Sequence, residues 1–158
     1  MTLKVLFVCL GNICRSPIAE AVFQKMVDEA GLSSQVQVDS VGTGSWHVDE
    51  RPHYGTRQVL IKHGITYNGR ARQITQKDMT ASDTYIIAMD QGNVTDLQLR
   101  FGQHPNLYRL LDFAQKTDER DERNVPDPYY TGKFDEVYQL VNDGCRGLLA
   151  TIQEQEKL

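Results

Sequence analysis

Apolar and polar residues are arranged along the chain in two ways, as short continuous apolar runs and as longer segments with helical spacing. The apolar runs have the length of strands and cover residues 3–9, 36–42, 85–89 and 107–111. Such runs are typical of strands buried on both faces of a parallel sheet. Segments with apolar residues at helical spacing follow each run, and they predict helices over residues 17–30, 52–63, 93–101 and 134–155.

The order of these elements predicts an α/β architecture. Strands separated by helices imply right-handed βαβ crossovers and a sheet that is mostly parallel. A length of 158 residues suits one domain, which we expect to span residues 1–158. In such sheets, ligands bind at the carboxyl ends of the strands. Cys9, Ser40 and Asp90 lie at or just past predicted strand ends. Asp127 lies on the loop after the fourth strand, so we expect all four to face one mouth.

Composition excludes several classes of protein. Hydrophobic residues make up 40% and charged residues 24%, as in soluble globular proteins. A net charge of -4 argues against a general nucleic-acid binder, and no apolar stretch approaches the roughly 20 residues that cross a bilayer. The three cysteines match neither a zinc pattern nor a disulfide framework, which favours a reducing, cytoplasmic compartment. The four histidines show no ligand spacing, and the charge-dense run 115–123 predicts a solvated loop.

The segment CLGNICRS, residues 9–16, carries the most specific chemical signal. It joins the first predicted strand to the first predicted helix. Gly11 and Asn12 are the residues best able to adopt left-handed backbone angles in this loop. Inward backbone N–H groups, the helix dipole and the fork of Arg15 predict a cradle for phosphate or sulfate. The spacing differs from that of a nucleotide-binding Walker loop. The expected phosphate-binding residues are Leu10, Gly11, Asn12, Ile13, Cys14 and Arg15.

Cys9 lies at the bottom of this predicted cradle. A helix N-terminus and a nearby arginine favour the thiolate form of cysteine, so we expect Cys9 to be a nucleophile beneath a bound phosphorus atom. Ser16 is expected to donate its hydroxyl to the thiolate and also to be the helix N-cap, with Pro17 as the first helical residue. If the bound group is a phosphate ester, the oxygen that leaves phosphorus needs a proton. Asp127, on a loop stiffened by Pro128, is the natural acid.

Four motifs resemble one protein family. VCLGNICRSP (8–17), DSVGTGSW (39–46), AMDQGN (88–93) and DPYY (127–130), in this order and at this spacing, look like those of the low-molecular-weight protein-tyrosine phosphatases. The resemblance covers essentially the whole chain. It implies a flavodoxin-like three-layer sandwich with a four-stranded parallel sheet, no metal or organic cofactor, and tyrosine-phosphorylated proteins as partners. It also implies that Asp127 is first the general acid and then the base that activates water.

The resemblance assigns roles to residues around the loop. Asn12 and Ser40 resemble the pair that holds the loop in its strained shape. We expect Asp90 to belong to the same support, its competing role being the N-cap of the helix that follows the third strand. Cys14 is implied to form a reversible disulfide with Cys9 under peroxide.

The remaining site residues are expected to select the substrate. Trp46, Tyr129 and Tyr130 are loop aromatics that can wall a slot for a flat phenyl ring, and the resemblance places Trp46 and Tyr129 beside the substrate. In the related phosphoarginine phosphatases, a threonine occupies the position of Ile13. An apolar branched side chain at that position suits a phenyl ring better than a guanidinium group.

Three other functions stay open at this point. One is a phosphoarginine phosphatase. Another is an arsenate reductase of the same fold, which needs two further cysteines in the middle of the chain, where residues 75–100 have none. The third is a phosphate-binding or redox module without turnover. An enzyme would lose all turnover in Cys9→Ser while still binding phosphate, whereas such a module has no turnover to lose. Surface aromatics predict a monomer or weak self-association.

Overall fold

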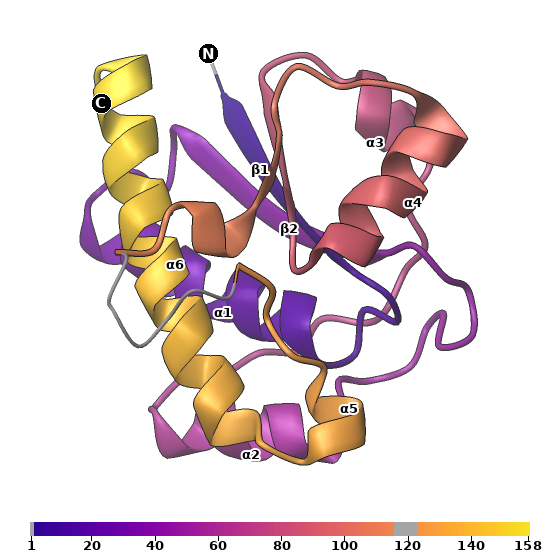
Figure 1. The fold of residues 1–158 in the computed structure, drawn as a ribbon. Coiled ribbons are helices and arrows are strands. Elements are labelled where there is room, and N and C mark those ends of the chain that lie inside the picture. The colour runs from indigo at the N-terminus through magenta and orange to yellow at the C-terminus, as the bar shows by residue number, and fades with distance from the viewer. Residues whose placement is uncertain (1, 116–122) are drawn as a thin grey trace.

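The computed structural model describes residues 2–115 and 123–158, so most of the charge-dense run, residues 116–122, lies outside the described part of the chain. Its elements are, in chain order, β1 (Leu3–Cys9), α1 (Arg15–Glu29), β2 (Val36–Gly42), α2 (Tyr54–Lys62), α3 (Gln76–Thr80), β3 (Thr84–Ala88), α4 (Gln91–Phe101), β4 (Leu107–Arg109), a 3-10 turn (Leu110–Asp112), α5 (Pro128–Thr131) and α6 (Phe134–Glu156). Figure 1 shows their arrangement.

The four strands form one parallel sheet in the order β2-β1-β3-β4, which confirms the predicted architecture. β1 lies inside the sheet, paired with β2 from Leu3 to Cys9 and with β3 on its other side. The chain therefore leaves β1 toward one edge and later returns to its opposite side. Such a reversal of strand order opens a crevice at the carboxyl ends of the strands, which is where β1 delivers Cys9.

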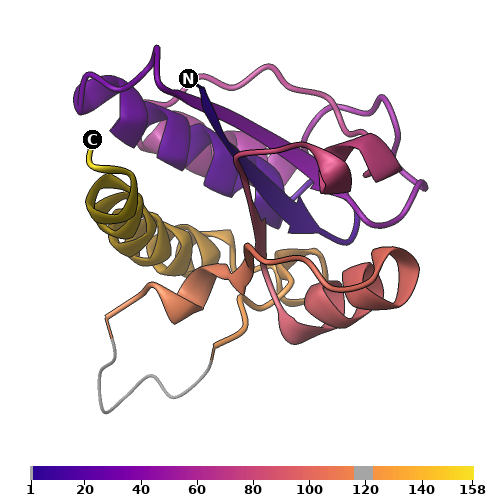
Figure 2. The ribbon, with the colours of Figure 1, turned by 90° about the horizontal axis from the view of Figure 1, so that it is seen from above.

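Helices cover both faces of the sheet and make a three-layer sandwich (Figures 1 and 2). Val5 and Phe7 of β1 point into the larger apolar cluster, which they share with α1, α2 and α6. Leu6 and Val8 point the other way, into a smaller cluster with Met79 of α3 and Leu97 of α4. All four side chains of β1 are fully buried, which explains why the strand shows no polar alternation in the sequence.

The helix boundaries correct one sequence prediction. α1 begins at Arg15 with Cys14 as N-cap, and no side chain caps it, so the prediction that Ser16 is the N-cap was wrong. Pro17 is tolerated because it lies in the first turn, where backbone N–H groups have no partner within the helix. The hydroxyl of Ser16 is thereby available for contacts inside the loop rather than for the helix end.

Two short helices and a strand end also differ from expectation. α3 and α5, of five and four residues, were not predicted, because elements this short show no apolar period. α3 is instead fixed by a capping box between Thr75 and Asp78. β4 ends at Arg109, since residues 110–112 turn into a 3-10 helix.

Among the helices of residues 2–115 and 123–158, none combines the length and apolar character needed to span a membrane.

Candidate active site

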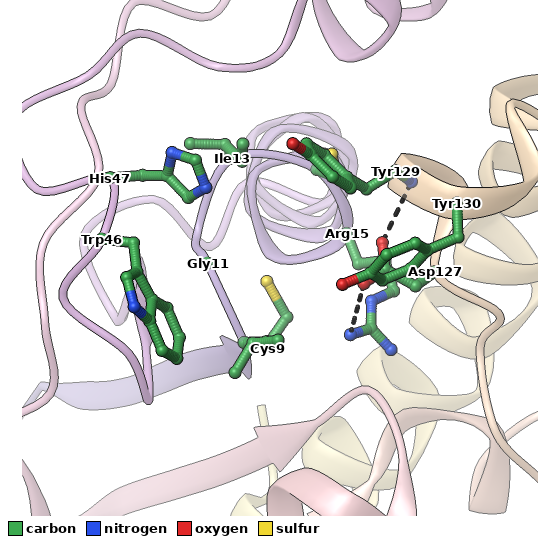
Figure 3. A pocket seen from close by; sticks show the side chains of 11 residues that line it. Cys9, Gly11, Ile13, Arg15, Trp46, His47, Asp127, Tyr129 and Tyr130 are labelled. Carbon is green, nitrogen blue, oxygen red and sulfur yellow. Dashed lines mark hydrogen bonds and ion pairs between the residues drawn. The ribbon is translucent and has the colours of Figure 1, made fainter.

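The loop between β1 and α1 forms the bottom of a pocket of about 250 Å³ at the carboxyl end of the sheet. Figure 3 shows Cys9 at the centre of this pocket, Trp46 and His47 on one side and Tyr129 and Tyr130 on the other. We call residues 9–16 the base of the pocket. We call Trp46, Tyr129 and Tyr130, which come from the loops after β2 and around α5, its rim.

Two hydrogen bonds converge on the sulfur of Cys9. The backbone N–H of Asn12 lies 3.3 Å from Sγ and donates to it. The hydroxyl of Ser16 lies 3.0 Å from the same atom, in the geometry of a second hydrogen bond. Both groups are buried, and Cys9 itself is only 2% exposed. The amide N–H donates to the sulfur, and the hydroxyl of Ser16 lies where it can either donate to the sulfur or accept from it.

The backbone carbonyls of the base point away from the pocket. Those of Cys9 and Leu10 accept hydrogen bonds from the N–H groups of Thr43 and Gly44, at 2.9 Å each. That of Ile13 accepts from the N–H of His53 at 2.8 Å. Because C=O and N–H point in opposite directions across a trans peptide, the N–H groups that follow these carbonyls are turned inward. The base therefore presents positive ends of peptide dipoles to its centre, as an anion site requires.

Asn12 and Gly11 make this loop shape possible for different reasons. Asn12 has a φ of 59°, which confirms the left-handed backbone predicted for it. Gly11 does not have a positive φ, so the same prediction for Gly11 was wrong. A Cβ on Gly11 would instead lie 3.1 Å from Cδ2 of His47. A side chain at this position would press against the imidazole that packs on the loop.

Arg15 is held in place from several directions. It is 3% exposed, and its Nη1 donates to Asp90 Oδ2 at 2.5 Å and to the carbonyl of Val125 at 3.0 Å. Burial lowers the pKa of Arg15, but the charge of Cys9 raises it. Hydrogen bonding and charge from Asp90, with a smaller contribution from Asp127, raise it further, above its ordinary value. The guanidinium group thus stays charged and fixed beside the sulfur.

The two aspartates predicted to face this mouth reach it from separate loops. Asp90 is the N-cap of α4, one of the two roles considered for it, and it accepts a hydrogen bond from Arg15 of the base. Asp127 is the N-cap of α5, where its Oδ1 accepts a hydrogen bond from the N–H of Tyr129 at 3.0 Å. Its other oxygen, Oδ2, lies 3.6 Å from Nη2 of Arg15, beyond hydrogen-bond distance. This oxygen faces the guanidinium group across the pocket while the other oxygen caps α5.

Asn12 links the base to the neighbouring strands. Its Nδ2 donates to Ser16 Oγ at 2.8 Å and to Ser40 Oγ at 3.0 Å. Its Oδ1 accepts from the backbone N–H of Arg72 at 3.0 Å. The pairing of Asn12 with Ser40 has the geometry expected from sequence. The contact with Arg72 was not foreseen, and no sequence pattern could have shown it, since any non-proline residue supplies a backbone N–H.

The rim is built from side chains that are largely exposed. Trp46 is 72%, Tyr129 54% and Tyr130 78% exposed, and all three line the pocket with the nearly buried Ile13. The ring of Tyr129 also packs edge-on against His53, at 5.9 Å between ring centres. The space between the rings is apolar on its sides and closed below by the base. It can admit a flat ring that carries an anion at its far end.

Comparison with known proteins places this arrangement in a family. The family model described as low molecular weight phosphotyrosine protein phosphatase matches residues 4–158. The chain is 46% identical to the low molecular weight protein-tyrosine-phosphatase YfkJ of Bacillus subtilis, over 99% of both chains. The crystal structure of YfkJ superposes with a TM-score of 0.91 over 98% of this chain and 97% of YfkJ. The chain belongs to the low-molecular-weight protein-tyrosine phosphatase family.

Other relatives agree with this assignment. PtpA of Staphylococcus epidermidis, also named a low molecular weight protein-tyrosine-phosphatase, is 41% identical over 99% of this chain and 97% of its own. A Drosophila protein whose structure is named an arginine phosphatase is 31% identical, with a TM-score of 0.84 over 96% of this chain and 98% of that one. The protein is thus an enzyme, a phosphatase with the flavodoxin-like α/β fold of this family.

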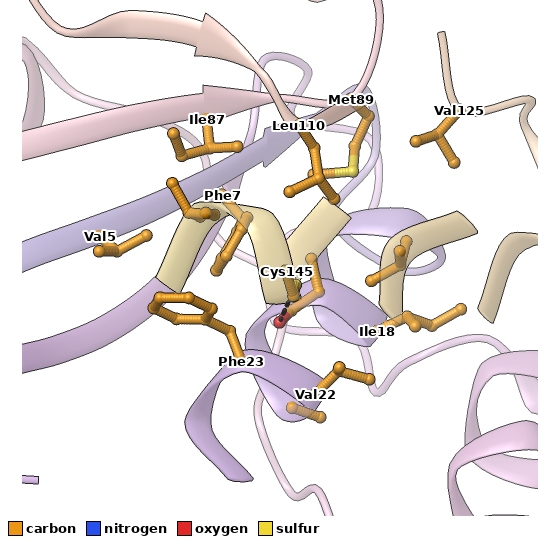
Figure 4. Close-up of a cluster of buried hydrophobic side chains, with 14 of the residues drawn as sticks. Val5, Phe7, Ile18, Val22, Phe23, Ile87, Met89, Leu110, Val125 and Cys145 are labelled. Atoms are coloured by element: carbon orange, nitrogen blue, oxygen red, sulfur yellow. Dashed lines mark hydrogen bonds between the residues drawn. The ribbon is translucent and has the colours of Figure 1, made fainter. Parts of the chain in front are cut away.

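The three cysteines of the phosphatase occupy different environments. Cys14 lines the pocket, and burial, reinforced by the charge of Cys9, raises its pKa to about 12. Cys145 is fully buried among apolar side chains such as Phe7 and Val22 (Figure 4), and burial raises its pKa as well. Cys14 and Cys145 are therefore neutral thiols, and no disulfide joins any of the three.

His47 is the pocket residue that sequence reasoning missed. It follows Trp46 directly, lines the pocket, and lies with its Nδ1 2.8 Å from a carboxylate oxygen of Glu50. Its position next to Trp46 is the signal that the sequence offers for it, whereas the spacing of the four histidines bears only on metal binding. Within residues 2–115 and 123–158, no group of three or more histidine, cysteine, aspartate or glutamate side chains is arranged to hold a metal ion.

Proposed function

We propose that this phosphatase hydrolyses phosphotyrosine in proteins through a phosphocysteine formed on Cys9. The observation that carries the proposal is that a sulfur in contact with the N–H of Asn12 and the hydroxyl of Ser16, a fixed guanidinium group and the carboxyl group of Asp127 meet at one pocket. Family membership supports phosphotyrosine hydrolysis. The roles of individual residues are argued from the geometry of the pocket.

In the first step, the thiolate of Cys9 attacks phosphorus and the bond from phosphorus to the tyrosine oxygen breaks. Arg15 and the inward N–H groups of the base bind the non-bridging oxygens, whose charge they neutralise. Asp127, protonated on Oδ2, gives its proton to the departing tyrosine oxygen. The products are a phosphocysteine, a free tyrosine side chain and an ionised Asp127.

In the second step, Asp127 takes a proton from a water molecule, which attacks phosphorus. The bond from phosphorus to sulfur breaks, and Cys9 leaves as a thiolate that the hydroxyl of Ser16, 3.0 Å away, stabilises. Inorganic phosphate is released, and Asp127 is protonated again for the next cycle. The whole sequence uses water and the side chains of the pocket.

The rim supports an aromatic substrate. Trp46 and Tyr129 on opposite sides of the pocket offer faces and edges to a phenyl ring, and Ile13 adds apolar surface next to the base. A phosphoserine side chain is too short to reach the sulfur from the level of the rim. The Drosophila arginine phosphatase shares this fold, so phosphoarginine is the competing substrate to test.

Phosphate release from matched peptides bearing phosphotyrosine, phosphoserine or phosphoarginine tests the proposal. We expect turnover of the phosphotyrosine peptide alone, its loss in Cys9→Ser, and a phosphocysteine trapped at Cys9 by rapid acid quench in Asp127→Ala. Preferred turnover of phosphoarginine would replace the substrate and keep the mechanism. Absence of phosphate release from every peptide by the wild type would overturn the proposed function.

The family resemblance implies a redox role for Cys14, which lines the pocket together with Cys9. We propose that peroxide converts Cys9 to a sulfenic acid and that the thiol of Cys14 then attacks its sulfur, forming a disulfide and releasing water. Mass spectrometry of the peroxide-treated protein should find this Cys9–Cys14 link. Sulfinic Cys9 without the link would refute it. The free state of all three cysteines fits the reducing, cytoplasmic compartment that we propose for the protein.

A further inference from the structure

Glu20 and Tyr67 lie outside the pocket, yet a continuous series of hydrogen bonds connects them to its nucleophile. Tyr67 Oη donates to Glu20 Oε1 at 2.7 Å, and Ser40 Oγ donates to the same oxygen at 2.6 Å. Ser40 is in turn the partner of Asn12 in the base. The series runs through Tyr67, Glu20, Ser40, Asn12, Ser16 and Cys9.

Glu20, at the end of the series farthest from Cys9, fixes the direction of these hydrogen bonds. A carboxylate can only accept, so the single hydroxyl proton of Ser40 is committed to Glu20. The oxygen of Ser40 must then accept from Asn12, which requires the NH₂ group of that side chain to face it. The other proton of the same NH₂ group goes to Ser16 Oγ. Ser16 thus accepts a hydrogen bond at its oxygen and still has its own proton to donate.

The inner end agrees with this direction. The backbone N–H of Arg72 can only donate, and it points at Oδ1 of Asn12, so the side-chain amide is held in one orientation from both sides. The proton of Ser16 has two possible acceptors, Cys9 Sγ at 3.0 Å and the carbonyl of Val41 at 3.5 Å. The sulfur is much the closer of the two.

We propose that Glu20, held by Tyr67, is a positioning residue that sets the direction of these hydrogen bonds so that Ser16 donates its proton to Cys9. This inference rests on the proposed role of Cys9 as the nucleophile and adds two residues that never touch the substrate. Glu20 acts at a distance, because it takes the proton of Ser40 and so leaves the oxygen of Ser40 to accept from the same NH₂ group of Asn12 that donates to Ser16.

The surroundings of Glu20 suit this role. Burial raises its pKa above the ordinary value of a glutamate, and the hydrogen bonds from Ser40 and Tyr67, which favour the carboxylate, offset this only in part. Of the other charged groups nearby, Asp39 raises the pKa and Arg72 lowers it. The pKa of Tyr67 is raised by burial and by the charge of Glu20, so its hydroxyl stays protonated and can only strengthen the carboxylate as an acceptor.

Gly69 gives Tyr67 the space to reach Glu20. A Cβ at this position would lie 2.1 Å from Tyr67 Oη, closer than any side-chain contact allows. Gly69 does not have a positive φ, so backbone strain does not explain a glycine here. The close approach of the Tyr67 hydroxyl explains the glycine at this position. Gly69→Ala is therefore a second way to separate Tyr67 from Glu20 without altering either residue.

The test measures the reactivity of Cys9 directly. The rate at which iodoacetamide modifies Cys9, followed by mass spectrometry across pH, reports how readily the sulfur ionises. Glu20→Leu, Tyr67→Phe and Gly69→Ala should each shift the midpoint of this profile to higher pH. We expect kcat for a phosphotyrosine peptide to fall about three- to tenfold in these variants, with KM changed by less than about twofold.

Two further variants separate direction from packing. Glu20→Gln should stay close to the wild type, because its amide oxygen can accept both bonds in place of Oε1. Tyr85→Phe is the matched control, because its hydroxyl likewise donates to a carboxylate, that of Glu156, but far from the pocket. It should leave the profile unchanged.

The proposal would be overturned by an unchanged reactivity profile in Glu20→Leu, whatever its thermal stability, or by equal shifts in the Gln and Leu variants. Failure of the proposed function would look different. The wild type would then release no phosphate from the phosphotyrosine peptide, while the alkylation profiles would still report on the hydrogen-bond series.

Discussion

The base and the rim of the pocket face the same ligand but are built in opposite ways. In the base, Cys9 and Arg15 are almost fully buried, and hydrogen bonds fix both side chains and backbone. In the rim, Trp46 and Tyr130 are more than two-thirds exposed. Under the proposed function, the phosphate would be positioned by buried, hydrogen-bonded groups, whereas the rest of the substrate would contact exposed side chains. Substitutions in the two regions should differ in kind as well as in size.

The largest effect is expected from Arg15→Lys. An ammonium group cannot donate to Asp90 and Val125 while also reaching two phosphate oxygens, as the guanidinium fork can. We expect kcat/KM for a phosphotyrosine peptide to fall about 10³-fold. Steady-state kinetics measure the loss, with Arg57→Lys on α2 as the control. A loss of less than about tenfold would show that charge alone suffices in the base.

Asp127→Asn should come next. Asparagine is a good N-cap, so it keeps the bond to the N–H of Tyr129 and leaves α5 in place, but it holds no transferable proton. We expect kcat to fall about 10²- to 10³-fold for phenyl phosphate and much less for p-nitrophenyl phosphate, whose leaving group needs no proton. Asp135→Asn, an exposed aspartate of α6, is the control. Equal losses with both substrates would remove Asp127 from the role of acid.

A smaller effect is expected where the backbone of the base meets β2. A Cβ on Gly42 would lie 2.8 Å from the carbonyl oxygen of Leu10, whereas on Gly11 it would lie 3.1 Å from a side-chain atom of His47. A side chain can move aside more easily than a hydrogen-bonded backbone. Gly42→Ala should therefore lower the free energy of unfolding by about 1–3 kcal/mol, and Gly11→Ala by less.

Urea denaturation of both glycine variants measures this difference, and kcat should follow the same order. If Gly11→Ala were the more damaging of the two, the base would owe its shape to packing against His47 and not to its contact with β2.

The smallest effect is expected in the rim. Trp46→Ala removes an exposed ring without leaving a cavity in the core, so we expect an unchanged melting temperature and a kcat within about twofold of the wild type. KM for a phosphotyrosine peptide should rise about three- to tenfold. Leu99→Ala, equally exposed on α4, is the control. A fall in kcat with unchanged KM would mean that the indole ring acts on the base.

Much of the fold and of the base could be predicted because local sequence determines both. The continuous apolar run of β1 reflects its burial on both faces. Asparagine is one of the residue types that favour left-handed backbone angles, so the conformation of Asn12 could be predicted from its type. Cys9, Arg15 and the aspartates at strand ends lie close in space because parallel strands deliver their carboxyl ends to one edge. These inferences need the order of elements but no tertiary detail.

The rest depends on contacts between segments far apart in the chain. Gly11 was assigned to backbone strain, whereas the structure assigns it to a close approach by His47, 36 positions away. The contact of Ser16 with Cys9 was expected, whereas the expectation that Ser16 also caps the helix was wrong, because α1 already begins at Arg15. The bond from Tyr67 to Glu20 joins residues whose types, taken singly, suggest only surface and core.

The outward carbonyls of the base have a consequence for how this enzyme can diversify. Because peptide groups of residues 43, 44 and 53 anchor that loop, its anion-binding shape is written in main chain and does not depend on the side chains of Leu10 or Ile13. Under the proposed function, exchanging those two side chains, or the rings above them, would alter which molecule is accepted while phosphate recognition persists. Selectivity and phosphate recognition would then be separately adjustable.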